Sequence, residues 1–213
     1  MRSHRPRYIA VEGPIGAGKS SLAEILGAEL QARVIRESPE DNPFLGPFYK
    51  DPRRNAMSVQ LFYLLARYAQ QGELSQGDLF AQGGVVSDYL FAKDRLFASL
   101  NLSPDEMALY DRLYQMLKPR TVTPDLVVYL QARTGVLIDR IRKRARPEEK
   151  TIRTEYLEDV ARAYAEFFFN YSEAPLLIVN ASDIDFVSNP EHRQELLQVI
   201  LHAPAGTSHW SRG

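Results

Sequence analysis

The chain has no cysteine, no long apolar run and almost no net charge, and each of these absences removes a class of function. Without cysteine there can be no disulfides, thiolate zinc sites or cysteine nucleophiles, which fits a cytoplasmic protein. No apolar run approaches membrane-spanning length, and the polar residues 1–5 lack the apolar segment of a signal peptide. A formal net charge of −1 argues against a general nucleic-acid or membrane surface, since such a surface needs an excess of basic side chains.

What remains is the composition of an ordinary globular protein. The 213 residues are 45% apolar and 25% charged, which is enough for one α/β domain with a substantial core. The sequence contains no internal repeat and no low-complexity tract. We therefore predict a single domain over residues 1–202 and a disordered tail over residues 203–213.

The most informative stretch is residues 13–20, which read Gly-Pro-Ile-Gly-Ala-Gly-Lys-Ser and match the phosphate-binding pattern G-x-x-x-x-G-K-[ST]. The apolar residues 8–11 before it predict a short buried strand, and the aliphatic residues at helical spacing after it predict a helix from about Lys19. Glycines let backbone N–H groups converge on phosphate oxygens, and the helix N-terminus adds the positive end of a dipole. This context predicts a nucleoside triphosphate site.

The loop supplies both charge and metal ligands for such a site. The Lys19 ammonium would contact the β- and γ-phosphates, and the Ser20 hydroxyl would be a ligand of Mg²⁺. The residues predicted to hold the triphosphate are Gly13, Pro14, Ile15, Gly16, Ala17, Gly18, Lys19, Ser20 and Ser21.

Strands and helices alternate along the rest of the chain. Further strands are predicted at residues 33–36, 83–87, 126–130 and 176–179. Helices are predicted at residues 57–70 and after the N-caps Ser103, Thr154 and Asn189. Alternation of this kind predicts a three-layer α/β fold, in which a parallel sheet of about five strands has helices on both faces.

Arginines and carboxylates follow the predicted strands at places suited to phosphoryl transfer. That reaction needs compensation of phosphate charge and a group that takes the proton of the acceptor hydroxyl. Arg140, Arg144 and Arg146 follow the fourth strand, where an arginine-rich lid could close over phosphates, although a solvated basic helix face has the same pattern. Glu37 follows the second strand and Asp88 the third, and either carboxylate could be the base because ligands sit at the carboxyl ends of parallel strands.

Gln60 and Arg67 lie seven residues apart on the predicted helix 57–70 and therefore share one of its faces. Periodicity alone does not separate a binding face from a solvated one.

Taken in order, these motifs resemble those of the P-loop deoxyribonucleoside kinases, the family of deoxyguanosine, deoxyadenosine, deoxycytidine and mitochondrial thymidine kinases. The resemblance runs from Tyr8 to about Ile200, and the ordered set is specific although each segment alone is not. The matching segments are residues 12–20, Glu37 with residues 41–45, residues 48–54, Gln60, Arg67, residues 94–98, residues 140–146 and residues 155–158. The resemblance implies a P-loop kinase fold with an arginine-rich lid.

The resemblance also implies roles for single positions around the acceptor. Glu37 would accept the proton of the 5′-hydroxyl. Gln60 would pair with the edge of the base, and Arg67 and Asp94 would line the base pocket. Arg140, Arg144 and Arg146 would be the lid arginines.

The resemblance also implies contacts to the sugar of the acceptor nucleoside and to the adenine of ATP. Tyr49 and Glu155 would hold the sugar 3′-hydroxyl, and crowding there would favour deoxyribose. The loop around Asp183, Asp185 and Phe186 would contact adenine through its backbone.

One departure from the family pattern lies after the third strand. Most members carry Glu-Arg-Ser or Asp-Arg-Ser there, whereas this chain reads Ser87-Asp88-Tyr89, a form that resembles the bacterial deoxyguanosine kinase branch. We expect Asp88 to contact substrate and, with Ser20, to bind Mg²⁺. Tyr89 stands where an arginine would contact Glu37 and the phosphates, and Arg95 is the predicted replacement.

The predicted function is ATP- and Mg²⁺-dependent phosphorylation of the 5′-hydroxyl of a purine deoxynucleoside, with deoxyguanosine first and deoxyadenosine or deoxycytidine as alternatives, in nucleotide salvage. A thymidylate kinase should carry an Asp-Arg pair after the second strand, and residues 36–38 do not. A non-catalytic nucleotide-binding subunit should have lost Lys19, Glu37 or the lid arginines, and all are present. The resemblance also implies a homodimer, and we expect a cytoplasmic protein with no nucleic-acid or membrane partner.

Overall fold

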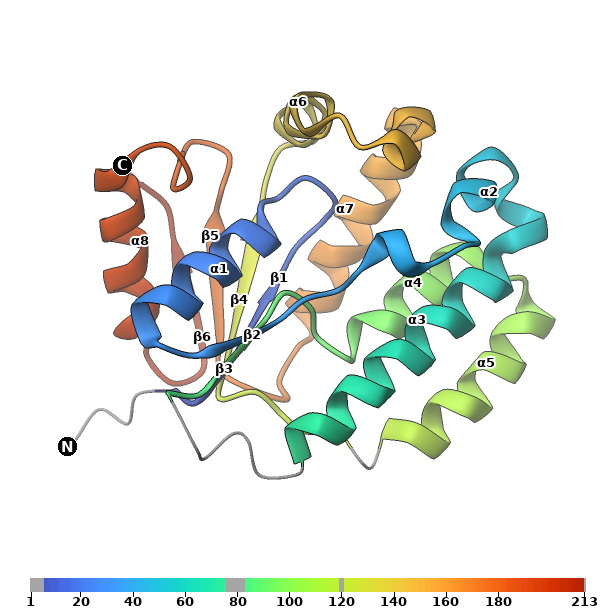
Figure 1. The fold of residues 1–213 in the computed structure, drawn as a ribbon, viewed down its shortest axis with the longest axis horizontal. Coiled ribbons are helices and arrows are strands. Elements are labelled where there is room, and N and C mark those ends of the chain that lie inside the picture. The colour runs from blue at the N-terminus through green and yellow to red at the C-terminus, as the bar shows by residue number, and fades with distance from the viewer. Residues whose placement is uncertain (1–5, 76–82, 119–120, 213) are drawn as a thin grey trace.

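The computed structural model describes residues 6–75, 83–118 and 121–212, and one parallel six-stranded sheet runs through its centre (Figure 1). The strand order is β2-β3-β1-β4-β5-β6, so β1 lies inside the sheet between β3 and β4. The strands are β1 (Tyr8–Glu12), β2 (Arg33–Ile35), β3 (Val85–Ser87), β4 (Leu126–Gln131), β5 (Leu176–Asn180) and β6 (Thr207–Trp210). The polar residues 1–5 and Gly213 lie outside the described ranges.

Alternate side chains of the central strands enter opposite layers, as the pleat of a strand requires. Ile9 and Val11 of β1 pack in one core, which α1 and α8 cover, whereas Tyr8 and Ala10 pack in the other, which α3, α4 and α7 cover. Figure 1 shows these two groups of helices on opposite sides of the sheet, which confirms the predicted three-layer fold. The helices named here are α1 (Lys19–Leu30), α3 (Pro52–Ser75), α4 (Lys93–Asn101), α7 (Thr154–Phe169) and α8 (Pro190–Leu201).

The remaining elements lie around the ends of these layers. They are α2 (Leu45–Lys50), α5 (Pro104–Leu117), α6 (Thr134–Arg144) and the short 3₁₀ helices η1 (Pro39–Asp41) and η4 (Pro147–Thr151). The prediction missed α2, and it placed the start of α3 five residues late, because Pro52 is tolerated in the first turn of a helix. Within the described ranges, no helix combines the length and the apolar character needed to cross a membrane.

Two of the three predicted N-caps are confirmed. Ser103 accepts from the Glu106 backbone N–H and Glu106 returns a bond to the Ser103 N–H, which together form a capping box on α5. The Asn189 side chain caps α8. The prediction for Thr154 is wrong, because Arg153 occupies the cap position and Thr154 is already the first residue of α7.

The prediction of a disordered tail is wrong for residues 207–210, which form β6 and raise the strand count from about five to six. The strand pairs in parallel with β5, and Trp210 packs against the core on the α1 side of the sheet. Beyond the strand, Arg212 makes an ion pair of 3.0 Å with Glu195 of α8. The tail therefore adds a strand to the sheet edge.

The strand order brings three acidic residues to one edge of the sheet. Glu12 ends β1, Glu37 follows β2 and Asp88 follows β3, and these three strands are neighbours. Because the strands are parallel, their carboxyl ends meet at the same edge, where ligands of such sheets bind.

Candidate active site

Residues 13–18 connect β1 to α1. Their glycines are required both because neighbouring atoms leave no room for a side chain and because the backbone adopts positive φ angles. Gly18 has φ of 103°, and a Cβ there would lie 2.8 Å from Cζ of Phe186. A Cβ on Gly13 would lie 2.5 Å from the Leu130 carbonyl oxygen. Both positions therefore exclude a side chain, as the motif predicts.

The Lys19 side chain folds back over this loop. Its Nζ donates to the carbonyl oxygens of Gly13, at 2.8 Å, and Pro14, at 3.3 Å. Burial and the nearby charge of Lys93 lower the pKa of Lys19 to about 8. The ammonium is thus held at the loop, in reach of an anion that the loop would cradle.

Ser20 and Asp88 form a pair of oxygen ligands beside Lys19. The Ser20 hydroxyl donates to Asp88 Oδ2 at 2.5 Å, and Asp88 Oδ1 accepts from the Glu37 backbone N–H at 2.7 Å. The described ranges contain no group of three or more histidine, cysteine or acidic side chains that could hold a metal. Mg²⁺ binds through one or two protein oxygens together with phosphates and water, so this pair fits it.

Glu37 is held by a buried arginine. Arg67 donates to Glu37 Oε1 through Nε at 2.8 Å and Nη2 at 2.5 Å, while its Nη1 lies 2.7 Å from Asp94 Oδ2. Burial by itself would raise the pKa of Glu37, but the charges of Arg67, Lys93 and Lys19 outweigh it and lower the pKa to about 2. Glu37 is therefore ionised at neutral pH.

The predicted replacement for the missing arginine is wrong. Arg95 pairs with Asp111 of α5 at 2.8 Å and is half exposed, away from Glu37. Lys93 lies near Glu37 instead, with its Nζ 3.4 Å from Glu37 Oε2. Residues two positions apart on a helix differ by about 200° in direction, so Lys93 and Arg95 cannot point the same way. Tyr89 itself is fully buried in the core.

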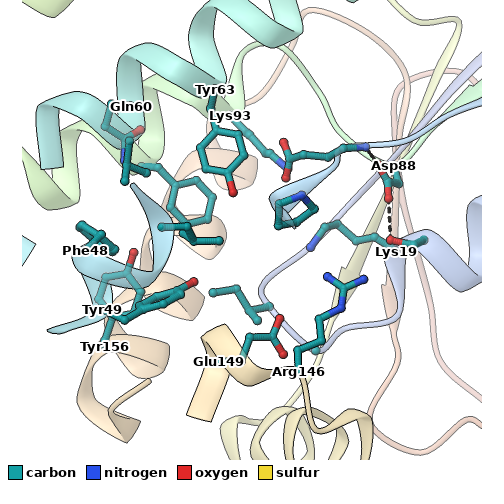
Figure 2. Close-up of a pocket in the computed structure, with 18 of the residues that line it drawn as sticks. Lys19, Phe48, Tyr49, Gln60, Tyr63, Asp88, Lys93, Arg146, Glu149 and Tyr156 are labelled. Atoms are coloured by element: carbon teal, nitrogen blue, oxygen red, sulfur yellow. Dashed lines mark hydrogen bonds and ion pairs between the residues drawn. The ribbon is translucent and has the colours of Figure 1, made fainter. Parts of the chain in front are cut away.

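A pocket joins these charged groups to an aromatic chamber between α2, α3 and α7. Figure 2 shows Lys19 and Asp88 at one end of the pocket and Gln60, Phe48 and Tyr49 at the other. The other labelled side chains around it are Tyr63, Lys93, Arg146, Glu149 and Tyr156.

The aromatic chamber has polar groups only at selected points. The rings of Phe48, Tyr49 and Tyr156 meet edge to face, with centroids 5.4 to 6.4 Å apart. Gln60 is 3% exposed and lines the same chamber, so its helix face is not a solvated one. An apolar wall with a few polar groups suits a flat heterocycle.

The predicted sugar ligand Glu155 lies outside the pocket. Glu155 is exposed at the start of α7, whereas Glu149 of η4 lines the pocket, as Tyr49 does (Figure 2). Sequence reasoning missed Glu149, although the acidic pair at positions 148 and 149, just after the basic segment 140–146, was a usable signal.

The three arginines of the predicted lid have different surroundings. Arg146 lines the pocket and Arg144 pairs with Glu149, with Nη2 to Oε1 at 2.5 Å. Arg140 does not join them. Its guanidinium donates to the carbonyl oxygens of Ala17, Ala181 and Ile184 at 2.8 to 3.3 Å, and so ties the phosphate loop to the loop after β5.

The predicted adenine loop lies directly against the phosphate loop. Phe186 is buried against Gly18, as described above. Asp183 pairs with Arg133 at 2.6 Å, and Asp185 accepts from the backbone N–H groups of Val187 and Ser188. These carboxylates have partners within the protein, and the backbone carbonyls of Ala181, Ile184 and Phe186 also accept hydrogen bonds, from Arg140 and Arg193.

Comparison with known proteins agrees with this geometry. The family model described as Deoxynucleoside kinase matches residues 9–203. The chain is 36% identical over 186 residues to a deoxyguanosine kinase of Bacillus subtilis (strain 168), which is 85% of this chain and 90% of that protein. It is 31% identical over 208 residues to a deoxyadenosine kinase of Lactobacillus acidophilus, which is 91% of this chain and 94% of that protein.

A solved structure extends the likeness to three dimensions. Deoxyadenosine kinase from M. mycoides with bound dATP superposes with a TM-score of 0.78 at 27% identity, over 90% of this chain and 97% of that one. Since the family model spans most of the sequence and the fold agrees with a solved kinase, this chain belongs to the deoxynucleoside kinase family.

Proposed function

We propose that this enzyme transfers the γ-phosphoryl group of ATP to the 5′-hydroxyl of a purine deoxynucleoside, with deoxyguanosine as its first substrate. The observation that carries the proposal is the position of Glu37. Glu37 lines the pocket that has Lys19 at its charged end and Gln60 in its aromatic chamber. Its backbone N–H donates to Asp88 of the charged end, and its carboxylate accepts from Arg67 of α3, the helix that also carries Gln60. A nucleoside in the chamber would present its 5′-oxygen at this point.

The reaction forms one bond and breaks another at the γ-phosphorus. The 5′-oxygen attacks phosphorus, the bond from phosphorus to the β,γ-bridging oxygen breaks, and the hydroxyl proton passes to Glu37. A carboxylate whose pKa is about 2 is a weak base. A loose transition state develops little positive charge on the nucleophile, so a weak base is sufficient.

The other charged residues would compensate the phosphate charge. We assign Lys19 and Arg146 to the phosphates, because both line the charged end of the pocket. Arg144 would join them once it leaves Glu149. Ser20 and Asp88 would hold Mg²⁺, which neutralises phosphate charge when bound.

The sugar and base would be held by the aromatic chamber. In place of Glu155, we assign Glu149 and Tyr49 to the sugar 3′-hydroxyl, since both line the pocket near each other. Gln60 would read the base edge. Arg67 would not, because Glu37 and Asp94 already occupy its guanidinium.

The choice of deoxyguanosine is supported by the similarity to the Bacillus subtilis enzyme and not by Arg67. A gain or loss of one well-formed hydrogen-bonded base contact changes selectivity by about 1–3 kcal/mol. With Gln60 as the reader, which can pair with either purine after a flip of its amide, we expect deoxyadenosine to be a slower second substrate.

An assay of ADP release with each of the four deoxynucleosides tests the proposal. We expect the largest kcat/KM with deoxyguanosine and the next with deoxyadenosine. A preference for thymidine would contradict the purine assignment, and no ADP release with any deoxynucleoside would contradict the function itself.

The proposal includes a homodimer in the cytoplasm. Its support is the set of exposed apolar side chains on two neighbouring helices, Leu65 of α3 and Leu109 and Met116 of α5, which are 53% to 73% exposed, together with a sequence free of cysteine. Light scattering after size-exclusion chromatography gives the mass, and a monomer at micromolar concentration would contradict the dimer.

A further inference from the structure

Lys93 is a buried cation in the first turn of α4, and no motif in the sequence points to it. Its side chain is 2% exposed, and its Nζ lies 3.4 Å from Glu12 Oε1 and 3.4 Å from Glu37 Oε2. It lines the pocket, as Glu37 also does, and Figure 2 shows it among the lining side chains. A buried ammonium is unfavourable unless carboxylates compensate it, so its two partners are informative.

Glu12 is a fixed anchor for this lysine. Its two oxygens accept from the backbone N–H groups of Leu90, at 2.6 Å, and Gly13, at 3.0 Å, and from the Tyr164 hydroxyl at 2.9 Å. A carboxylate that accepts three hydrogen bonds besides its contact with Lys93 cannot move far. Lys93 is therefore held in place by Glu12 and directed at Glu37.

The two oxygens of Glu37 have different cations. Arg67 takes Oε1 and Lys93 approaches Oε2. The arginine holds one oxygen with two N–H donors, and the lysine adds a compact charge near the second oxygen. Together they determine the direction of the carboxylate without covering it, since Glu37 stays 19% exposed to the pocket.

We propose that Lys93 is a positioning residue for the reaction: it orients the Glu37 carboxylate toward the acceptor hydroxyl and supplies the positive charge that Tyr89 cannot. Tyr89 is packed in the core with Tyr8 and Leu74, so the end of β3 has no cation of its own. Lys93 delivers that charge from four residues further along the chain. This inference rests on the proposed function of Glu37.

Three variants test the proposal in steady-state assays with ATP and deoxyguanosine. Lys93→Gln removes the charge and should lower kcat by about 10²-fold, while KM for ATP stays within about threefold. Lys93→Arg restores a cation and should recover most of that loss. Arg95→Gln removes a charge two residues away on the same helix, which points at Asp111 instead of the pocket, and should leave kcat unchanged.

Activities are divided by the amount of protein that binds a non-hydrolysable ATP analogue, so that unfolded protein does not count. A purely structural lysine would lower the melting temperature of Lys93→Gln and leave this corrected kcat at the wild-type value, which would overturn the proposal. Failure of Lys93→Arg to recover activity in a protein with wild-type melting temperature would also overturn it.

A comparison in the Glu37→Gln background keeps the test open if Lys93→Gln does not fold, because the double variant also removes one carboxylate that the lysine compensates. If Lys93 acts through Glu37, Glu37→Gln and Glu37→Gln/Lys93→Gln should have equal residual kcat. A further tenfold loss in the double variant would overturn the proposal. Wild-type activity of Glu37→Gln alone would instead contradict the proposed function.

Discussion

At the scale of single residues, the site depends on charges that are buried and paired. Arg67 is 4% exposed and Asp94 is fully buried, and Glu37 shares the same guanidinium. Such a group orients its members well, but the loss of one member leaves another charge unpaired. The two predictions at this scale separate the chemical role of the group from its structural role.

Glu37→Gln keeps the size of the side chain but cannot accept a proton. We expect kcat to fall by roughly 10²–10⁴-fold with KM for ATP little changed, as measured by ADP release. Glu40→Gln is the matched control, because Glu40 is exposed three residues further on and does not line the pocket. A rise in the nucleoside KM alone would make Glu37 a binding residue and Asp88 the better candidate base.

Arg67→Met should weaken the fold without changing the choice of base. Asp94 would be left as an unpaired buried charge, at a cost of about 3–5 kcal/mol in the free energy of unfolding measured with denaturant. The ratio of kcat/KM for deoxyguanosine to that for deoxyadenosine should stay within about threefold of the wild-type ratio. A larger change would show that the guanidinium reads the base despite its two carboxylates.

At the scale of single elements, helix ends and the sheet edge decide local stability. The capping box of α5 follows from local sequence, since all its atoms lie within four residues. By contrast, α7 begins without a side-chain cap although a threonine stands at its start. The last strand, β6, depends on contacts with residues far away in the sequence.

Ser103→Ala should lower the free energy of unfolding by about 1 kcal/mol, because the N–H of Glu106 loses its acceptor. Thr154→Ala is the comparison, and we expect almost no change because Thr154 makes no cap. Denaturant unfolding of both variants measures the difference. Equal losses in the two variants would contradict the assignment of the caps.

Trp210→Ala should lower the free energy of unfolding by about 1–3 kcal/mol, less than the loss for a fully buried tryptophan, because Trp210 is only partly buried against the core. His209 of the same strand is exposed, so His209→Ala serves as its control. Turnover should stay at the wild-type value in both, since neither residue lines the pocket. An unchanged free energy of unfolding in Trp210→Ala would show that the packing of this side chain contributes nothing to stability.

At the scale of the whole molecule, the pocket is lined by elements from different layers of one fold. The phosphate loop comes from β1 and α1, whereas α2, α3 and η4 supply most of the aromatic chamber and its polar groups. Arg140 connects the phosphate loop to the loop after β5. Binding of ATP should therefore stabilise the entire sheet and not only its first strand.

A non-hydrolysable ATP analogue at 100 times its dissociation constant should raise the free energy of unfolding by about 2.7 kcal/mol. Lys19→Ala should remove most of this increase at the same analogue concentration and abolish turnover, while the melting temperature without ligand stays close to wild type. Lys143→Ala, at an exposed position of α6, is the control. Wild-type turnover by Lys19→Ala would contradict the assignment of the phosphate loop.

Local patterns in the sequence determined the features whose causes are local. The glycine loop, the buried strands, two helix caps and the alternation of strands with helices all follow from residues close together in the chain, and the structure confirms them. The positions of Glu37, Asp88, Gln60 and Arg146 beside the pocket could also be predicted, because ends of parallel strands and recognisable motifs carry them.

Only the tertiary structure decided which charged groups meet. Lys93 replaces Arg95 because a helix directs residues two apart to opposite sides, and Glu149 replaces Glu155 because η4, and not the start of α7, borders the pocket. The tail becomes β6 because the edge of β5 and the α1-side core give it partners. Each of these outcomes depends on distances between segments far apart in the chain, which composition and periodicity do not contain.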